Sequence, residues 1–200
     1  MARRSDHKRE ELHRMALDAA SDIVSQDGLR GLSTRRIAKE IGYTAGTLYQ
    51  LFEDLDDLIA QMNVNTLGAL FDACTGVDYE AGPEPALQEL AARYIHFVSE
   101  HPRLWNALFE HSLPDGKILS ERHNSAVMKL LGLVETALAP LFPPGKEDRR
   151  HHEARVLWAS LYGIASLAAS QKLGEAETPE DMVASLAANY IAGLRAQCVA

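Results

Sequence analysis

Side chains suited to binding a polyanion gather in the segment STRRIAKEIGYTAGTLYQLF, which runs from Ser33 to Phe52. Its cationic residues are Arg35, Arg36 and Lys39. An arginine guanidinium can form two hydrogen bonds to the edge of guanine, and hydroxyl and backbone N–H groups bind phosphate. The segment therefore predicts contact with nucleic acid. The alternative is a solvated helix face, because runs of charge are common on protein surfaces.

Charge is distributed unevenly along the chain. The 200 residues include 28 acidic and 20 basic side chains, for a net charge of −8. Residues 1–52 nevertheless carry nine Lys and Arg against seven Asp and Glu, whereas residues 53–200 carry eleven against twenty-one. A net negative charge disfavours indiscriminate nucleic-acid binding. The pattern predicts a polyanion-facing N-terminal end and a remainder with another task.

Two short helices joined by a tight turn are predicted within this basic segment. Ser33 is a suitable N-cap for a helix over Thr34–Ile41, and Gly42 is suited to the left-handed conformation that ends a helix. Thr44 is a suitable N-cap for a second helix. This is the helix-turn-helix arrangement, in which the second helix enters the major groove. Small side chains that allow close approach to DNA lead that helix: Ala45, Gly46 and Thr47.

Helical periodicity continues through the rest of the chain. Apolar residues recur at steps of three and four, and sustained alternation is absent. The sequence therefore predicts an all-α fold of about nine helices. Gly28 and Gly31 are expected to end the first helix, and the segment GVDYEAGPEP over residues 76–85 is expected to be a linker. The last two helices are predicted near residues 150–172 and 179–197.

The segment GLRGLSTRRIAKEIGYTAGTLYQLFEDLDDLI resembles the N-terminal pattern of the TetR family of one-component transcriptional regulators, with Tyr49 and Phe52 three residues apart. The segments YIHFVSEHPRLWNALFE and VLWASLYGIASLA resemble, more loosely, the body of a subgroup with a Trp and a Gly on its eighth helix. The resemblance implies a three-helix DNA-binding domain over residues 1–53, with the motif at 33–52. It also implies a ligand-binding and dimerisation domain over residues 54–200.

From this resemblance we expect a homodimeric repressor that binds a palindromic operator in double-stranded DNA. An apolar or aromatic small molecule is expected to release it. Arg35 matches a position that reaches a base edge, whereas Arg36 and Lys39 are expected to contact phosphate or to make no contact. Tyr49 is expected to pack, to donate to phosphate, or both. The full predicted DNA-binding set is Ser33, Thr34, Arg35, Arg36, Lys39, Thr44, Ala45, Gly46, Thr47 and Tyr49.

Two positions depart from the family pattern. Leu55 lies where members often carry a Lys that touches phosphate, and it is surrounded by the acidic run EDLDD. Leu51 lies where a His or Tyr is usual. Fewer phosphate contacts predict weaker electrostatic anchoring to DNA.

The resemblance also implies a ligand pocket among the fifth to eighth helices. The residues predicted to line it are His96, Trp105, Phe109, His111, Met128, Trp158 and Tyr162. Core packing is the alternative for each of these aromatics, and His96 alternatively makes a hydrogen bond within the core. The last two helices are predicted to form a four-helix dimer interface through Trp158, Leu161, Ala165, Leu186, Tyr190 and Leu194.

Other classes of protein are disfavoured. Adjacent histidines in RRHH, residues 149–152, point to different sides of a helix, so no metal site is predicted there. Glu10 and His13 form the single Glu-x-x-His pair, whereas a di-iron bundle needs two. We therefore predict no enzyme and no cofactor. Two alternatives stay open: a ligand-independent DNA-binding protein, and a helical adaptor whose basic end binds an acidic partner.

The expected location is the cytoplasm. Cys74 and Cys198 lie far apart without metal-ligand spacing, as expected of reduced packing residues. No apolar run approaches the roughly 20 residues that a membrane span needs. The N-terminal segment MARRSDHKREEL lacks the apolar stretch of a secretory signal. No membrane partner is therefore expected.

Overall fold

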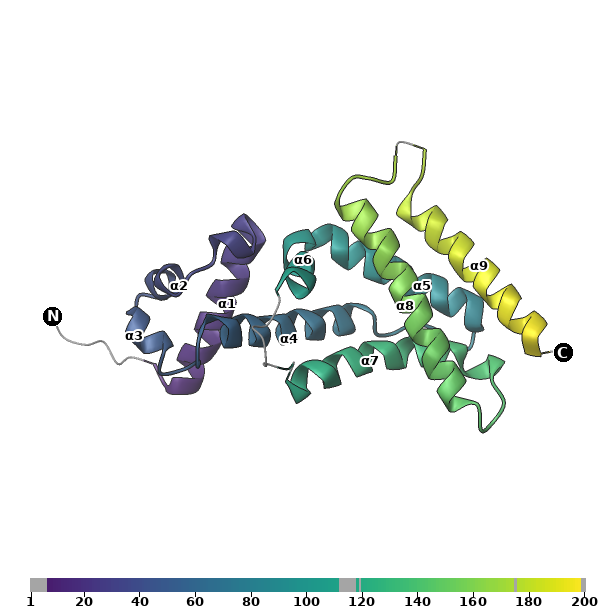
Figure 1. Ribbon diagram of the computed structural model, residues 1–200, viewed down its shortest axis with the longest axis horizontal. Coiled ribbons are helices and arrows are strands. Elements are labelled where there is room, and N and C mark those ends of the chain that lie inside the picture. The colour runs from purple at the N-terminus through teal and green to yellow at the C-terminus, as the bar shows by residue number, and fades with distance from the viewer. Residues whose placement is uncertain (1–6, 112–117, 119, 175, 199–200) are drawn as a thin grey trace. The chain divides into compact units, whose positions relative to one another are not determined.

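Helices account for the regular structure of this chain, as the apolar periodicity predicted. The computed structural model describes residues 7–111, 118, 120–174 and 176–198. Over these residues it contains nine α-helices, two short 3-10 helices and no strand (Figure 1). The prediction of an all-α fold with about nine helices is confirmed. Packing divides the chain into a first unit, residues 1–68 with 101–124, and a second unit, residues 69–100 with 125–200.

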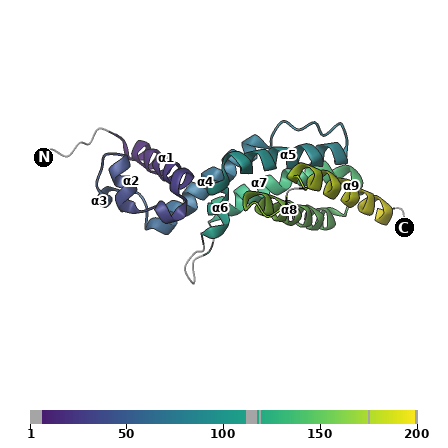
Figure 2. The same cartoon turned by 90° about the horizontal axis from the view of Figure 1, so that it is seen from above.

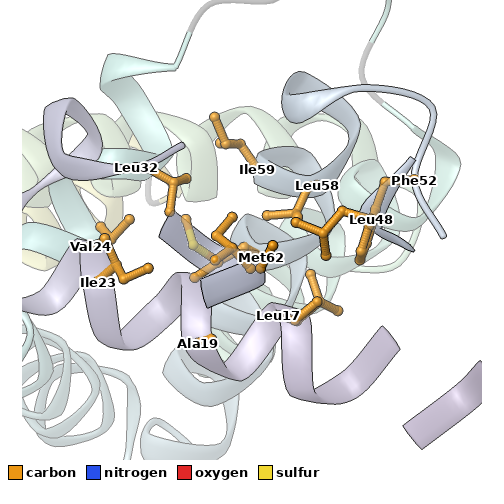
Figure 3. Close-up of a cluster of buried hydrophobic side chains, with 14 of the residues drawn as sticks. Leu17, Ala19, Ile23, Val24, Leu32, Leu48, Phe52, Leu58, Ile59 and Met62 are labelled. Carbon is orange, nitrogen blue, oxygen red and sulfur yellow. The ribbon is translucent and has the colours of Figure 1, made fainter. Parts of the chain in front are cut away.

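The first unit is built around the N-terminal helices. Its elements are α1 (Arg9–Asp27), η1 (Leu29–Gly31), α2 (Thr34–Glu40), α3 (Ala45–Leu48), the first part of α4 (Leu55–Ala73) and α6 (Pro102–Glu110). Figure 3 shows Leu17 from α1, Leu48 from α3 and Met62 from α4 pointing toward one another. Ala107 on α6 belongs to the same buried cluster. Burial of such side chains contributes about 1.5–3 kcal/mol each, so this shared core holds α2 and α3 in place.

Glycines shape the end of α1. Gly28 has a φ of 71°, and its N–H donates to the Val24 carbonyl over 2.8 Å, which stops the helix as predicted. Gly31 has a different role, because it lies in η1 rather than at the end of α1. A Cβ atom at Gly31 would lie 2.6 Å from the Cβ of Asp27, closer than carbon atoms can pack. Gly31 therefore allows the chain to pass close to the last turn of α1.

The second unit is a bundle of the later helices. Its elements are the end of α4, α5 (Pro83–Glu100), most of α7 (Glu121–Leu138), η2 (Ala139–Leu141), α8 (Glu147–Ala169) and α9 (Pro179–Cys198). Helix α5 packs against both α8 and α9, and α8 and α9 also contact each other (Figures 1 and 2). Leu138 and Ile191 are fully buried there. The linker predicted over residues 76–85 is confirmed for residues 76–82, whereas residues 83–85 form the start of α5, where proline is tolerated in the first turn.

Local capping explains where α9 begins. The backbone N–H of Asp181 donates to the Thr178 hydroxyl oxygen over 3.1 Å, and that hydroxyl donates to the Asp181 carboxylate over 2.7 Å. This reciprocal pair is a capping interaction that fixes the start of the helix. Helices α8 and α9 lie within three residues of their predicted bounds.

The predicted domain boundary after residue 53 does not coincide with the packing units. Most of α4 and all of α6 belong to the first unit. Helix α6 packs against α1, and the Asn63 side-chain amide on α4 donates to the Ala107 carbonyl over 3.3 Å. These contacts join segments that are distant in sequence. Whether DNA binding and ligand binding divide at residue 53 stays a prediction.

Among the residues that the structure describes, no helix is both long enough and apolar enough to cross a bilayer.

Candidate nucleic-acid interface

The turn between α2 and α3 forms as the sequence predicts. The Ser33 side chain accepts a hydrogen bond from the Arg36 backbone N–H over 3.3 Å, which caps α2. Gly42 has a φ of 76°, a left-handed conformation that is sterically unfavourable for residues with a Cβ atom. The Tyr43 N–H reaches back to the Ala38 carbonyl over 2.8 Å, the six-to-one bond of a helix-ending glycine turn. Local chemistry therefore fixes how the chain passes from α2 into α3.

Helix α3 is short, and its cap differs in part from the prediction. Thr44 is the N-cap residue, but its side chain makes no capping bond to the backbone. Its hydroxyl instead lies 3.3 Å from the hydroxyl of Thr47. The Thr47 N–H is satisfied by the Thr44 carbonyl at 2.9 Å, so the turn closes through the backbone. Two hydroxyl groups are thus paired at the start of α3.

Tyr49 and Phe52, which are three residues apart in the sequence, differ in burial. Phe52 is only 4% exposed and stacks on the His13 ring with a centroid separation of 4.6 Å. Tyr49 is 60% exposed. Leu48, directly before it, is fully buried. The underside of α3 therefore anchors in the core, while its opposite face presents Tyr49 to solvent.

The three cations of α2 have different environments. Arg35 and Lys39 are exposed. The Arg36 guanidinium lies 2.5 Å from the Asp27 carboxylate and donates to the Gly31 carbonyl over 3.2 Å. Arg36 thus connects α2 to the end of α1, whereas Arg35 and Lys39 point their charges to solvent.

All ten predicted DNA-binding residues lie on α2, α3 and their caps within the first unit. Ser33, Arg35, Lys39, Thr44, Gly46 and Tyr49 are exposed, and Thr34, Arg36, Ala45 and Thr47 are half-buried. The structure therefore brings the predicted set together on one element pair. Their individual contacts with DNA stay predictions.

Sequence reasoning missed one contact beside this surface. The His7 Nδ1 atom lies 2.8 Å from the Tyr43 hydroxyl, and the two rings meet edge to face. Residue 7 precedes α1, and Tyr43 lies in the turn before α3. Because 36 residues separate them, no local pattern signals the pair. It holds the start of α1 against the helix-turn-helix turn.

The two departures from the family pattern have structural explanations. Leu51 and Leu55 pack against the hydrophobic cluster of the first unit. The acidic residues on both sides of Leu55 cap α4: the Asp54 carboxylate accepts from the Asp57 N–H over 2.8 Å, and the Asp57 carboxylate accepts from the Glu53 N–H over 3.1 Å. Carboxylates are favourable at a helix N-terminus. These residues serve folding of the first unit.

An apolar cavity of about 60 Å³ lies within the second unit. Residues from α5, α7, α8 and α9 line it, together with Cys74 just after α4. The lining residues are Cys74, Leu87, Leu90, Ala91, Tyr94, Leu130, Leu133, Val134, Leu157, Trp158, Leu161, Val183, Leu186 and Ala187.

The seven predicted pocket residues are not brought together at this cavity, although all seven lie in the described part of the chain. Trp158 lines it. Trp105, Phe109 and His111 belong to the first unit, where Trp105 is buried and the His111 Nε2 atom lies 3.0 Å from the Asp56 carboxylate. Helical periodicity predicted burial of Trp105 but could not indicate against which unit. Ligand contact by these residues stays a prediction.

The remaining three predicted pocket residues lie on the second unit outside this lining. The His96 side chain is 71% exposed and its Nε2 atom lies 3.3 Å from the Glu100 carboxylate. Met128 is 46% exposed and its sulfur accepts from Arg155 over 4.0 Å. Tyr162 is half-buried on α8. The expectation that His96 is a core residue does not match this exposure, because its side chain points to solvent.

The six residues predicted for the dimer interface have partners within their own chain. Ala165 and Leu194 are buried, while Trp158, Leu161 and Leu186 line the cavity. The Tyr190 hydroxyl donates a short hydrogen bond to the Glu153 carboxylate, and burial together with this bond raises the Tyr190 pKa far above its ordinary value. Pairing of α8 and α9 with a second copy stays a prediction.

Two family models match this chain. One, described as bacterial regulatory proteins of the tetR family, matches residues 16–62, and another, described as tetracyclin repressor-like C-terminal domain, matches residues 87–190. The second match spans more than half of the 200 residues, so the chain belongs to the TetR family. It is a DNA-binding transcriptional regulator of that family, which consists of regulators and not of enzymes.

Individual relatives agree with this assignment. The chain is 29% identical over 174 residues to YobS of Bacillus subtilis (strain 168), an uncharacterized HTH-type transcriptional regulator, and the match covers 86% of this chain and 85% of that protein. Its fold is similar to that of a protein of unknown function from Rhodococcus sp. RHA1, with a TM-score of 0.74 at 22% identity over 97% of this chain and 100% of that one. A TetR-family regulator from Streptomyces coelicolor superposes with a TM-score of 0.68 at 20% identity over 94% and 82% of the respective chains.

Proposed function

We propose that this protein is a cytoplasmic homodimeric repressor that binds a palindromic operator and leaves it when a small apolar or aromatic molecule occupies the second unit. The observation that carries the proposal is the apolar cavity of the second unit. One of its lining residues, Cys74, directly follows the last residue of α4. Helix α4 starts within the first unit, so one continuous helix runs from the helix-turn-helix unit to the cavity wall.

Operator recognition follows from the exposed face of α2 and α3. Arg35 reads a base edge, because its exposed guanidinium suits guanine O6 and N7. Lys39 and Tyr49 contact phosphate, which positions the unit without specifying sequence. Two such units related by a two-fold axis require half-sites about 34–36 Å apart, one turn of duplex, or a multiple of that spacing.

Dimer formation uses the outward faces of α8 and α9, since their inward faces serve the cavity and core of the same chain. Leu167 on α8 is 42% exposed, so it presents a large apolar side chain to solvent. Exposed Ala184 and Ala192 on α9 allow close approach of a second helix. A self-complementary two-fold interface is the commonest form of homodimer.

Release from the operator is a coupling between two sites. A ligand that enlarges the cavity shifts the wall at Cys74 and with it the end of α4. If ligand weakens operator binding by some factor, the operator must weaken ligand binding by the same factor. Couplings of this kind are typically about 5–150-fold.

The test combines footprinting with a binding titration. Genomic fragments selected by the protein are footprinted, and the protected site is expected to show dyad symmetry. Fluorescence anisotropy then measures operator affinity with and without compounds that bind the second unit. Reciprocal weakening supports the proposal. A protected site without symmetry would contradict dimeric recognition, and ligand binding without any change in operator affinity would contradict ligand release.

One further measurement separates the adaptor alternative. An adaptor with a basic end should bind any DNA equally and lose that binding by about 0.2 M salt, because phosphate contacts release counterions. A repressor keeps a preference for its operator over scrambled sequence at that salt. Ligand-independent DNA binding would show the same sequence preference with no response to any compound.

A further inference from the structure

The described residues that line the second-unit cavity carry no formal charge. Its lining side chains are aliphatic or aromatic apart from one thiol, and their polar atoms belong to Cys74, Tyr94 and Trp158. Among the residues that the structure describes, no aspartate, glutamate, lysine, arginine or histidine lines the cavity. Apolar lining favours ligands by area and dispersion, and offers nothing to compensate an ion.

Two cations are adjacent in sequence to lining residues. Lys129 precedes Leu130 on α7 and is exposed. The other, Arg93, is held by partners outside the lining. Arg93 precedes Tyr94 on α5, but its guanidinium donates to the Glu89 carboxylate over 2.7 and 3.1 Å. It also donates to the Thr75 carbonyl over 2.9 Å. These bonds fix the charge of Arg93 outside the cavity lining and neutralise it with Glu89. An anionic ligand in the cavity would therefore lack a counter-charge at the wall.

The thiol in the wall is neutral as well. Burial raises the pKa of Cys74 to about 11, against a smaller opposing effect from Arg93. At neutral pH the side chain is therefore an uncharged S–H group. A cationic ligand would find neither a thiolate nor a carboxylate among the lining residues.

Size adds a second constraint. An apolar cavity of about 150 Å³ lined by Leu, Ile and Phe accommodates benzene. The cavity here measures about 60 Å³. A ligand of one aromatic ring therefore requires the lining side chains to move apart. This displacement of the wall is the event through which occupancy would reach neighbouring helices.

We propose that this cavity binds an uncharged, largely apolar small molecule of about one aromatic ring, and rejects carboxylates and ammonium ions of the same skeleton. Burying an ion without a partner costs far more than the apolar contacts of a small ring return. This inference rests on the proposed function, because it concerns the same ligand site. The selectivity of the cavity for uncharged over charged ligands can nevertheless be measured without operator DNA.

The experiment compares three seven-carbon aromatic probes at pH 7: benzyl alcohol, benzoate and benzylammonium. The full chain is labelled with 5-fluorotryptophan and observed by fluorine NMR. Its two tryptophans serve different purposes: Trp158 lines the cavity, and Trp105 is buried in the first unit as an internal reference. Trp158→Phe and Trp105→Phe variants assign the two resonances.

Benzyl alcohol is expected to shift the Trp158 resonance in a saturable manner and to leave that of Trp105 in place. Each ion is expected to need a concentration on the order of 100-fold higher, or to give no saturable shift. A Trp158 shift by benzoate or benzylammonium at the concentration that suffices for benzyl alcohol would overturn the proposal. So would the absence of any Trp158 shift by the alcohol up to its solubility.

Matched variants locate the binding. Ala91 lines the cavity, and its neighbour Ala92 is exposed on the same helix. Ala91→Leu is expected to abolish the benzyl alcohol shift, and Ala92→Leu to preserve it. If circular dichroism shows that Ala91→Leu does not fold, Ala187→Val in the lining and Ala196→Val at an exposed position of α9 form a second pair. Equal binding by both members of a folded pair would place the alcohol elsewhere and overturn the proposal.

Failure of the proposed function gives a different result. If benzyl alcohol binds selectively at Trp158 while operator affinity is unchanged, the inference on ligand charge stands and ligand-released repression fails. If a charged compound both binds at Trp158 and releases the operator, ligand-released repression stands and the inference on ligand charge fails.

Discussion

The Arg36 guanidinium lies 2.5 Å from the Asp27 carboxylate and thereby joins the first turn of α2 to the last residue of α1. The same guanidinium donates to the Gly31 carbonyl in the intervening turn. Both partners are more than a third exposed, so the pair is worth only about 0–1 kcal/mol. Its main effect is geometric. Arg36 belongs to the predicted DNA-binding residues, and the pair holds its guanidinium against the end of α1.

Removing either partner is expected to have the same consequence. Asp27→Asn and Arg36→Ala should each lower the free energy of unfolding by up to about 1 kcal/mol, measured by urea denaturation. Neither should change the slope of log operator affinity against log salt. If Arg36 contacts phosphate instead, Arg36→Ala alone would reduce that slope by about 1. A reduced slope confined to Arg36→Ala would therefore rule out a purely positioning role.

Arg35→Ala is expected to relax sequence preference. If Arg35 reads a base edge, the substitution should cost about 1–3 kcal/mol of operator binding and erase discrimination at one base pair per half-site. Lys39→Ala is the matched comparison, because it lies on the same exposed helix and should weaken every sequence alike. Anisotropy titrations on the operator and on single-base variants measure both. Sequence-independent losses in both variants would make Arg35 a phosphate contact.

The two helix caps of the motif should respond differently to substitution. Ser33→Ala removes a side-chain bond to the Arg36 N–H and is expected to cost about 0.5–2 kcal/mol of stability. Thr44→Ala removes no such bond, because Thr44 pairs with the Thr47 hydroxyl, and should cost less. Thermal unfolding of the two variants gives the comparison. A larger loss for Thr44→Ala would show that its hydroxyl does cap α3.

The dimer is expected to depend on the outer face of α8. Leu167→Asp would place a charge in an apolar interface and should convert the dimer to a folded monomer, as observed by sedimentation. Met128→Asp is the control, since Met128 is similarly exposed on α7 outside the proposed interface. Far-UV circular dichroism confirms that each variant folds. A Leu167→Asp protein that sediments as a stable dimer would require a different interface.

Cys74 is expected to resist alkylation at neutral pH. Its pKa of about 11 against an ordinary 9.0 makes the reactive thiolate roughly 100-fold scarcer below pH 9. In a Cys198→Ser variant, the iodoacetamide rate followed by mass spectrometry should rise about tenfold per pH unit until about pH 11. Rapid modification at pH 7 would contradict this. Because the folded pKa exceeds the unfolded one, the Cys74 contribution to stability is complete below pH 9 and is lost as pH rises toward 11.

Several features of this protein follow from short stretches of sequence. Ser33 and Gly42 mark helix ends correctly because capping and left-handed turns involve atoms only a few residues apart. The periodicity of apolar residues likewise establishes that the fold is helical and which side of each helix is buried. The helix-turn-helix set can therefore be assembled from sequence, since all its members lie within one short segment.

Tertiary structure decides which helices share a core. Trp105 has the spacing of a buried residue in either unit, and only packing places it with α1 rather than at the cavity. The same applies to the ties between His7 and Tyr43 and between Arg36 and Asp27, whose partners come from separate helices. Periodicity specifies that a face is buried but not what it is buried against, because many helix pairings satisfy the same apolar stripe. The uncharged cavity and the inward use of Leu161 and Leu186 are consequences of that pairing.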